Sequence, residues 1–189
     1  MLIRALGFVL ETVFFLLIAA ALLRAWMNWL RINMSGQPGS VVMALTDWIV
    51  KPLRRLLPKA MVQSRVDWAS VVAACVFAIG YATVWGLLFG MLTSLSQGWT
   101  LPSPAILVQL PVFAGKMLLR VALQGLFVMV LGYALLSWVQ PAAPAYQLLG
   151  RLVEPLLLPL RRFIPTIGGV DLSALVLLVL LQVGMIVLV

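Results

Sequence analysis

The sequence predicts an all-α membrane protein with four transmembrane helices, and three observations lead to this fold class. Of the 189 residues, 64% are AVILMFWYC and 10% are charged, whereas about a quarter of an ordinary soluble domain is charged. Four apolar runs are long enough to cross a hydrocarbon layer of about 30 Å. A unit of span, basic connection and span also occurs twice, which predicts two parallel two-helix repeats related by an axis along the membrane normal.

The first repeat is expected over residues 1–96 and the second over 121–189. Their predicted spans cover about 6–23 and 68–92, and about 121–139 and 172–189, respectively. Trp26 and Trp29 follow the first span and Trp138 closes the third, as in the aromatic belts of membrane interfaces. The first span is alternatively a cleaved signal peptide, because Arg4 precedes an apolar stretch that ends in three alanines. The aromatic flank and the repeat favour a retained helix.

Residues 97–120 are predicted to link the repeats. Gln97 and Gly98, followed by two prolines at 102 and 104, are typical of a turn. Residues 105–115 are apolar but too few to cross the membrane, and they contain Pro111. We therefore expect an interfacial or re-entrant segment there.

The distribution of basic residues predicts the orientation of the chain. Nine lie in the two connections that follow the first and third spans: Arg31, Lys51, Arg54, Arg55, Lys59, Arg65, Arg151, Arg161 and Arg162. Arg4, Lys116 and Arg120 lie on the other side. The positive-inside rule therefore predicts cytoplasmic connections and outside termini for a multi-pass protein of the bacterial inner membrane.

The two connections repeat one motif. Residues 51–58 read KPLRRLLP and residues 158–165 read LPLRRFIP, so the prolines and the arginine pairs coincide. On a helix, residues 49–59 separate into an apolar arc and a basic arc. Pro52 and Pro159 suit a first helical turn, and Pro58 and Pro165 suit the end. We therefore expect a short basic amphipathic helix in each connection, lying in the cytoplasmic interface with its apolar arc in lipid.

These residues resemble the YggT family of integral membrane proteins, to which the chloroplast YlmG and cytochrome b6 assembly proteins are similar. The resemblance is densest over residues 154–173, from EPLLLPLRRFIP to GGVDLS. The first repeat departs from this signature, because Gln63-Ser64-Arg65 replaces the glycine pair and Ala69 occupies the place of Ser173. The resemblance implies a membrane protein without recognised enzymatic activity, linked to cell division, envelope organisation, membrane-complex assembly or ion and osmotic homeostasis.

The basic helices are the first candidate binding site. Its residues are Lys51, Arg54, Arg55, Arg161 and Arg162. They either anchor the fold and set its topology, or they bind an anionic lipid headgroup, an acidic partner segment or a phosphate, because the planar guanidinium binds phosphate and carboxylate through two points. The positive-inside rule already explains the net charge of +8. We therefore do not expect nucleic acid as a partner.

Three further groups of residues stand out. Asp67 and Asp171 each precede a span, as a helix cap, as a counter-ion for an arginine of the same connection, or as both. Glu11 lies within the first span, where it either reaches the interface and pairs with Arg4 or forms a proton or cation site. Small residues recur every fourth position in the second span, and Ala82, Gly86 and Gly90 among them predict close helix packing with this chain, a second copy or another protein.

The composition offers few residues for catalysis or for metal and cofactor binding. The chain has no His and one Cys, and no paired carboxylates fall together within a span, so we expect no catalytic site, no metal site and no cofactor. We expect a non-catalytic organising or assembly factor that binds anionic lipids, other membrane proteins or a second copy. The alternative is a channel or transporter component in ion or osmotic homeostasis, for which Glu11, Gln124 and Gln182 supply little polar lining.

Overall fold

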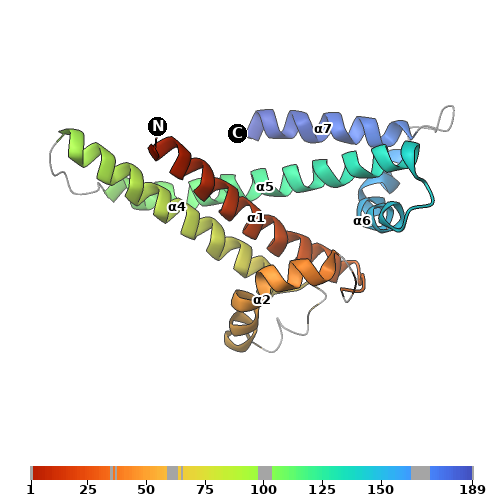
Figure 1. The fold of residues 1–189 in the computed structure, drawn as a ribbon, viewed down its shortest axis with the longest axis horizontal. Helices are drawn as coiled ribbons and strands as arrows, with labels where there is room; N and C mark the ends of the chain where they lie inside the picture. Colours follow the sequence, from red (N-terminus) through yellow and green to blue (C-terminus); the bar gives the residue numbers. More distant parts are fainter. Residues whose placement is uncertain are drawn as a thin grey trace. The chain divides into compact units, whose positions relative to one another are not determined.

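The structure is a computed structural model that describes residues 2–34, 36, 38–58, 64, 66–97, 104–162 and 171–188. Within these residues all regular structure is helical. The helices are α1 (Leu2–Trp29), α2 (Gly39–Leu56), α4 (Trp68–Gln97), α5 (Pro104–Val139), α6 (Pro144–Arg161) and α7 (Leu172–Leu188); Figure 1 shows their order. Several predicted features lie outside the described residues, namely Lys59, Arg65, the glycine pair at 168–169 and the turn at 98–103.

Among the described residues, three helices are long and apolar enough to cross a membrane. These segments are Ala5–Trp29, Trp68–Leu88 and Gln109–Val139, and they fit a membrane protein. The fourth predicted span is the apolar helix α7, whose 17 residues reach about 26 Å, somewhat less than the thickness of the hydrocarbon layer. The arrangement of four spans in two parallel repeats stays a prediction.

The chain forms two compact units, residues 1–121 and 122–189. In the first, α1 and α4 pack along each other, and α2 packs across the C-terminal end of α1 and the N-terminal end of α4 (Figure 1). Small residues allow the helices to approach: a Cβ placed on Gly7 of α1 would lie 2.9 Å from the Trp85 ring of α4. In the second unit, residues of α5, α6 and α7 share a core that contains Val130, Leu157 and Leu177.

The segment at 105–115 belongs to a longer helix than the sequence predicts, because α5 runs without interruption over 36 residues with Pro111 inside it. Its interfacial or re-entrant position stays a prediction. A proline leaves one carbonyl of the preceding turn without its helical partner, which membrane helices tolerate. The continuous helix is about 54 Å long, so it exceeds the hydrocarbon thickness.

The basic helices also begin earlier than expected. α2 starts at Gly39 and α6 at Pro144, so Pro52 and Pro159 lie inside the helices instead of in their first turns. Asp47 and Glu154 lie within the helices as well. The arginines therefore fall at the C-terminal ends, where a positive charge interacts favourably with the helix dipole.

The apolar arc predicted to face lipid packs largely on protein. Val50 of α2 is fully buried, and Ile49, Leu53 and Leu57 pack against the core of the first unit. Leu56 alone of the predicted arc is largely exposed, at 81%. The first connection thus folds onto the core of its own unit through this arc.

Candidate functional site

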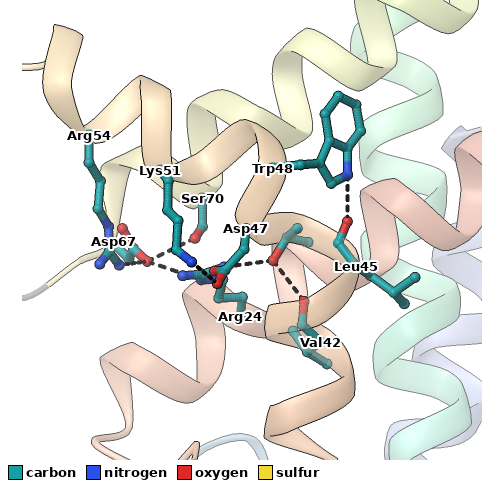
Figure 2. A network of polar contacts seen from close by, with 10 residues as sticks. Arg24, Val42, Leu45, Asp47, Trp48, Lys51, Arg54, Asp67 and Ser70 are labelled. Atoms are coloured by element: carbon teal, nitrogen blue, oxygen red, sulfur yellow. Dashed lines mark hydrogen bonds and ion pairs between the residues drawn. The ribbon is translucent and has the colours of Figure 1, made fainter.

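A buried arginine near the end of α1 organises the first candidate site. Arg24 Nη1 donates to Thr46 Oγ1 at 2.8 Å and to Asp47 Oδ1 at 2.7 Å, both on α2. Its Nε lies 3.9 Å from Asp67 Oδ2, and its side chain is 6% exposed. Figure 2 shows this guanidinium at the centre of the polar contacts. Arg24 therefore holds together α1, α2 and the residue that precedes α4.

Asp67 forms the second half of this arrangement. Its Oδ2 accepts from Arg54 Nη2 at 2.7 Å and from Ser70 Oγ at 2.8 Å, and its side chain is as buried as that of Arg24. A buried carboxylate is costly unless it is paired and hydrogen-bonded, and Asp67 is both. The contact with Arg54 fastens the C-terminal end of α2 to the start of α4.

A solvent-exposed lysine completes what we call the Arg24 cluster, which comprises Arg24, Asp47, Lys51, Arg54 and Asp67. Lys51 Nζ lies 2.8 Å from Asp47 Oδ2, and the lysine side chain is 71% exposed. Hydrogen bonds from Lys51 and then Arg24 hold the pKa of Asp47 below its usual value. Three cations face two carboxylates, so the cluster carries one net positive charge.

The second unit has a related set of contacts, the Arg161 cluster, which comprises Arg161, Asp171, Tyr133 and Tyr146. Arg161 donates from Nε to Asp171 Oδ2 at 3.0 Å and from Nη2 to the Tyr133 hydroxyl at 3.1 Å. That hydroxyl also accepts from Tyr146 at 3.3 Å, and the two rings stack with centroids 5.0 Å apart. The cluster ties the end of α6 to α5 and to the start of α7.

Asp171 also caps α7. Its Oδ1 accepts from the backbone N–H of Ser173 at 3.1 Å, which satisfies one of the free amide groups at a helix start. Burial raises the pKa of Asp171, but the hydrogen bonds from Arg161 and Ser173 outweigh it, so the pKa lies below its usual value. The side chain thus acts both as cap and as counter-ion.

The two clusters divide each arginine pair into two different environments. Arg54 and Arg161, the first arginines, occupy the same position of the repeat, and each contacts the aspartate that precedes the next helix. Arg55 and Arg162, the second arginines, are exposed, and no ion pair to either is found among the described residues. The first arginine is therefore occupied within the fold, whereas the second is open to a ligand.

The remaining predicted residues do not join these clusters. Glu11 lies 4.0 Å from Arg120 of α5, and both side chains are about half exposed; the side chain of Arg4 is outside the described residues. Ala82 is buried in the core of the first unit. No described atom lies within 4 Å of a Cβ placed on Gly86, so Gly86 makes no close helix contact within the described chain, and packing with a second copy or another protein stays a prediction. The surroundings of Gly90 are not among the described residues.

Arg24 is a site residue that the sequence does not single out, and the same holds for Thr46 and Tyr133. The position of Arg24 after the first apolar run was visible, but its partners are 22 and more residues away in the chain. The signal in the sequence was the charge itself, because an arginine at the end of a span either reaches the membrane interface or pairs with another polar group. Within the described residues, no group of three or more His, Cys, Asp or Glu side chains could hold a metal ion.

Comparison with known proteins places this arrangement in a family. The model of the CCB3/YggT family matches residues 3–88 and 114–189, one stretch for each repeat. The chain belongs to the CCB3/YggT family. The resemblance seen in residues 154–173 is thereby confirmed, and the two matched stretches extend it over most of the chain.

Individual members of the CCB3/YggT family are similar over nearly the whole length. The uncharacterized protein YggT of Escherichia coli K12 is 33% identical over 182 residues, which cover 95% of this chain and 87% of the relative. An uncharacterized protein in the proC 3' region of Vibrio alginolyticus is 32% identical over 181 residues, which cover 95% and 90%. No solved structure matches the chain.

Proposed function

We propose that the protein is a non-catalytic organising factor of the bacterial inner membrane that binds anionic lipid headgroups or acidic segments of membrane-protein partners. One observation carries the proposal: in both repeats the second arginine is exposed and has no ion pair among the described residues. Because a guanidinium stays charged and offers two parallel donors, it suits phosphate and carboxylate ligands.

The fold supports this function by fixing where the free arginines lie. The first arginine of each pair binds the aspartate that precedes α4 or α7, so the neighbouring arginine is held at the helix end without rearrangement. A binding group held in place loses less conformational entropy on binding than a mobile one. In the orientation expected from the basic residues, both arginines face the cytoplasmic leaflet, whose lipids are partly anionic.

A channel or transporter role is less well supported. Glu11, the candidate cation site, lies 4.0 Å from the Arg120 guanidinium. A neighbouring positive charge opposes the binding of a cation at the same carboxylate. The contact therefore favours a structural role for Glu11.

The proposal is tested by purification from native membranes in mild detergent, with the retained lipids and proteins identified by mass spectrometry. The variant is Arg55→Gln/Arg162→Gln. The matched control is Arg31→Gln/Lys116→Gln, which removes two exposed basic groups outside α2 and α6. We expect an acidic lipid or a partner to be retained by the unmodified chain and the control and lost from the variant. Identical profiles in all three correctly inserted proteins would overturn the proposal.

A lysine variant sharpens the test. Arg55→Lys/Arg162→Lys keeps both charges but removes the planar two-point donor. We expect the retained ligand to fall to an intermediate amount, since charge attraction remains while the two-point hydrogen bonding is lost. Full loss upon glutamine substitution with full retention upon lysine substitution would show that charge alone is recognised, against the two-point contact proposed here.

A further inference from the structure

The exposed side of α2 carries an apolar stripe that the core of the protein does not use. Val41, Leu45, Trp48 and Leu56 are 52%, 43%, 62% and 81% exposed. Their spacing of four, three and eight residues places them on one narrow arc of a helix. The buried residues Val42, Thr46 and Val50 lie about a third of a turn away. α2 therefore has a second, mostly exposed apolar face beside the one that is buried against α1 and α4.

The orientation of this stripe is fixed. The opposite side of α2 is held by the Arg24 cluster and by the packing of Val50 in the core of the first unit. Figure 2 shows Trp48 directed away from the charged groups of that cluster. Rotation of α2 to bury the stripe would break these contacts, so the stripe stays outward.

Trp48 is equipped for an apolar surrounding. Its indole N–H already donates to the Leu45 carbonyl at 2.8 Å, so the N–H keeps a hydrogen-bond acceptor when the ring moves from water into lipid. The ring also contacts Phe77 of α4, with centroids 5.5 Å apart. Phe77 lies within the apolar segment Trp68–Leu88 that is long enough to cross a membrane. The stripe thus adjoins the part of α4 that would lie in hydrocarbon.

Positive charge borders the stripe. Lys51 and Arg55 are exposed on the side of α2 next to it, because both positions fall between the stripe and the cluster residues Asp47 and Arg54 on a helix of 100° per residue. An apolar face flanked by cations matches the acyl chains and phosphates of an anionic leaflet. The second repeat differs, since Leu158 is the one large apolar side chain described as exposed on α6.

We propose that α2 lies in the surface of an anionic phospholipid leaflet, with Val41, Leu45, Trp48 and Leu56 among the acyl chains and Lys51 and Arg55 at the phosphates. This deepens the proposed function by naming an anionic phospholipid as the ligand on the α2 side, and it rests on that proposal for the role of Arg55. The placement of the stripe itself rests only on exposure, helix geometry and the contact with Phe77.

The test measures the depth of two neighbouring positions. In full-length protein with Cys75→Ser, Leu45→Cys and, separately, Ala44→Cys are labelled with the fluorophore NBD and reconstituted in vesicles of phosphatidylcholine and phosphatidylglycerol. Ala44 is exposed but lies about 100° around the helix from Leu45. Val41→Cys gives a second reporter on the stripe should the first variant fail to fold.

We expect bromine-labelled lipids to quench the label at residue 45 at least about twofold more than that at 44, because an interfacial helix buries one face to about 5–10 Å. Equal and weak quenching at all three positions would overturn the proposal. So would weak quenching at 41 and 45 with emission that depends on protein density, because a second copy would then cover the stripe.

A lipid-specific arm tests the charges. Brominated phosphatidylglycerol should quench residue 45 more than brominated phosphatidylcholine does, and Arg55→Gln should remove this preference while depth is kept. Equal quenching by the two brominated lipids in the protein that keeps Arg55 would overturn the proposal that the ligand is an anionic lipid. The depth experiment succeeds or fails independently of the purification experiment, because it requires no retained ligand.

Discussion

Replacing Asp67 by asparagine should destabilise the first unit strongly. The carboxylate accepts from Arg54 and Ser70 and lies 3.9 Å from Arg24 Nε. Asparagine keeps the shape and one acceptor oxygen but removes the negative charge. The buried Arg24 then loses one of its two counter-ions, and its Nε already has no hydrogen bond to any described residue.

The magnitude follows from the two contacts of unequal exposure. Two unit charges 3.9 Å apart attract by about 4 kcal/mol at an effective dielectric constant near 20. The Arg54 side chain is 44% exposed, so it regains water and adds less than about 1 kcal/mol. We expect Asp67→Asn to lower the free energy of unfolding by about 3–5 kcal/mol, as for other broken buried pairs.

The assay is reversible unfolding in mixed micelles by titration with SDS, followed by tryptophan fluorescence. Asp171→Asn is the matched control, because its ion pair with Arg161 is more exposed, at 17% and 36% for the two side chains; we expect about 1.5 kcal/mol there. A double-mutant cycle of Arg24→Met with Asp67→Asn should give a coupling energy of at least about 1 kcal/mol. Equal losses for the two asparagine variants, or a coupling energy near zero, would refute the reasoning.

Three further predictions address other contacts. Lowering the pH below about 4 should reduce the melting temperature: because hydrogen bonds hold the pKa of Asp47 below its usual value, its stabilisation is present above the unfolded pKa and lost as pH falls through the folded one. Asp47→Asn should flatten this dependence in a pH series of melting curves. Gly7→Ala should cost about 1–3 kcal/mol in SDS titrations, because its Cβ would meet the indole of α4 at 2.9 Å; Gly86→Ala, with no described atom within 4 Å, should be neutral, and equal costs would contradict the packing. Tyr133→Phe should cost about 0.5–1.5 kcal/mol by removing the hydroxyl that accepts from Arg161, and an unchanged melting temperature would show that this contact is not formed.

Several helix ends were predictable from the sequence because local signals mark them. α4 begins at Trp68 and α7 at Leu172, each after an aspartate, and α5 ends at Val139, directly after Trp138. Caps and aromatic belts act within a few residues, so a single sequence contains them. The prolines were a poorer guide. Pro52 and Pro159 were expected in first helical turns and Pro111 in a short segment between the repeats, but α2, α5 and α6 run through these prolines.

The clusters were predictable only in part. That an aspartate before a span could pair with an arginine of its own connection follows from the charges, but the sequence does not distinguish the first arginine from the second. The structure does, through the positions of the helix ends. Contacts between α1 and α2, such as Arg24 with Asp47, join residues more than 20 apart and follow no short-range pattern.

The two repeats share the contact between the first arginine and the aspartate before the next helix, but they differ in the residues that surround it. In the first repeat the pair Arg54–Asp67 is joined by a buried arginine from α1, Arg24, and α2 presents an apolar stripe. In the second repeat tyrosine hydroxyls take the place of the second charge. A charged cluster is costly to bury, so we infer that the Arg24 cluster serves to hold α2 in one orientation.

Arg24→Met should therefore release α2 and reduce the lipid quenching at residue 45, whereas Tyr133→Phe should leave that quenching unchanged. Quenching at the unmodified level in both variants would show that the packing of Val50 and its neighbours alone orients the helix.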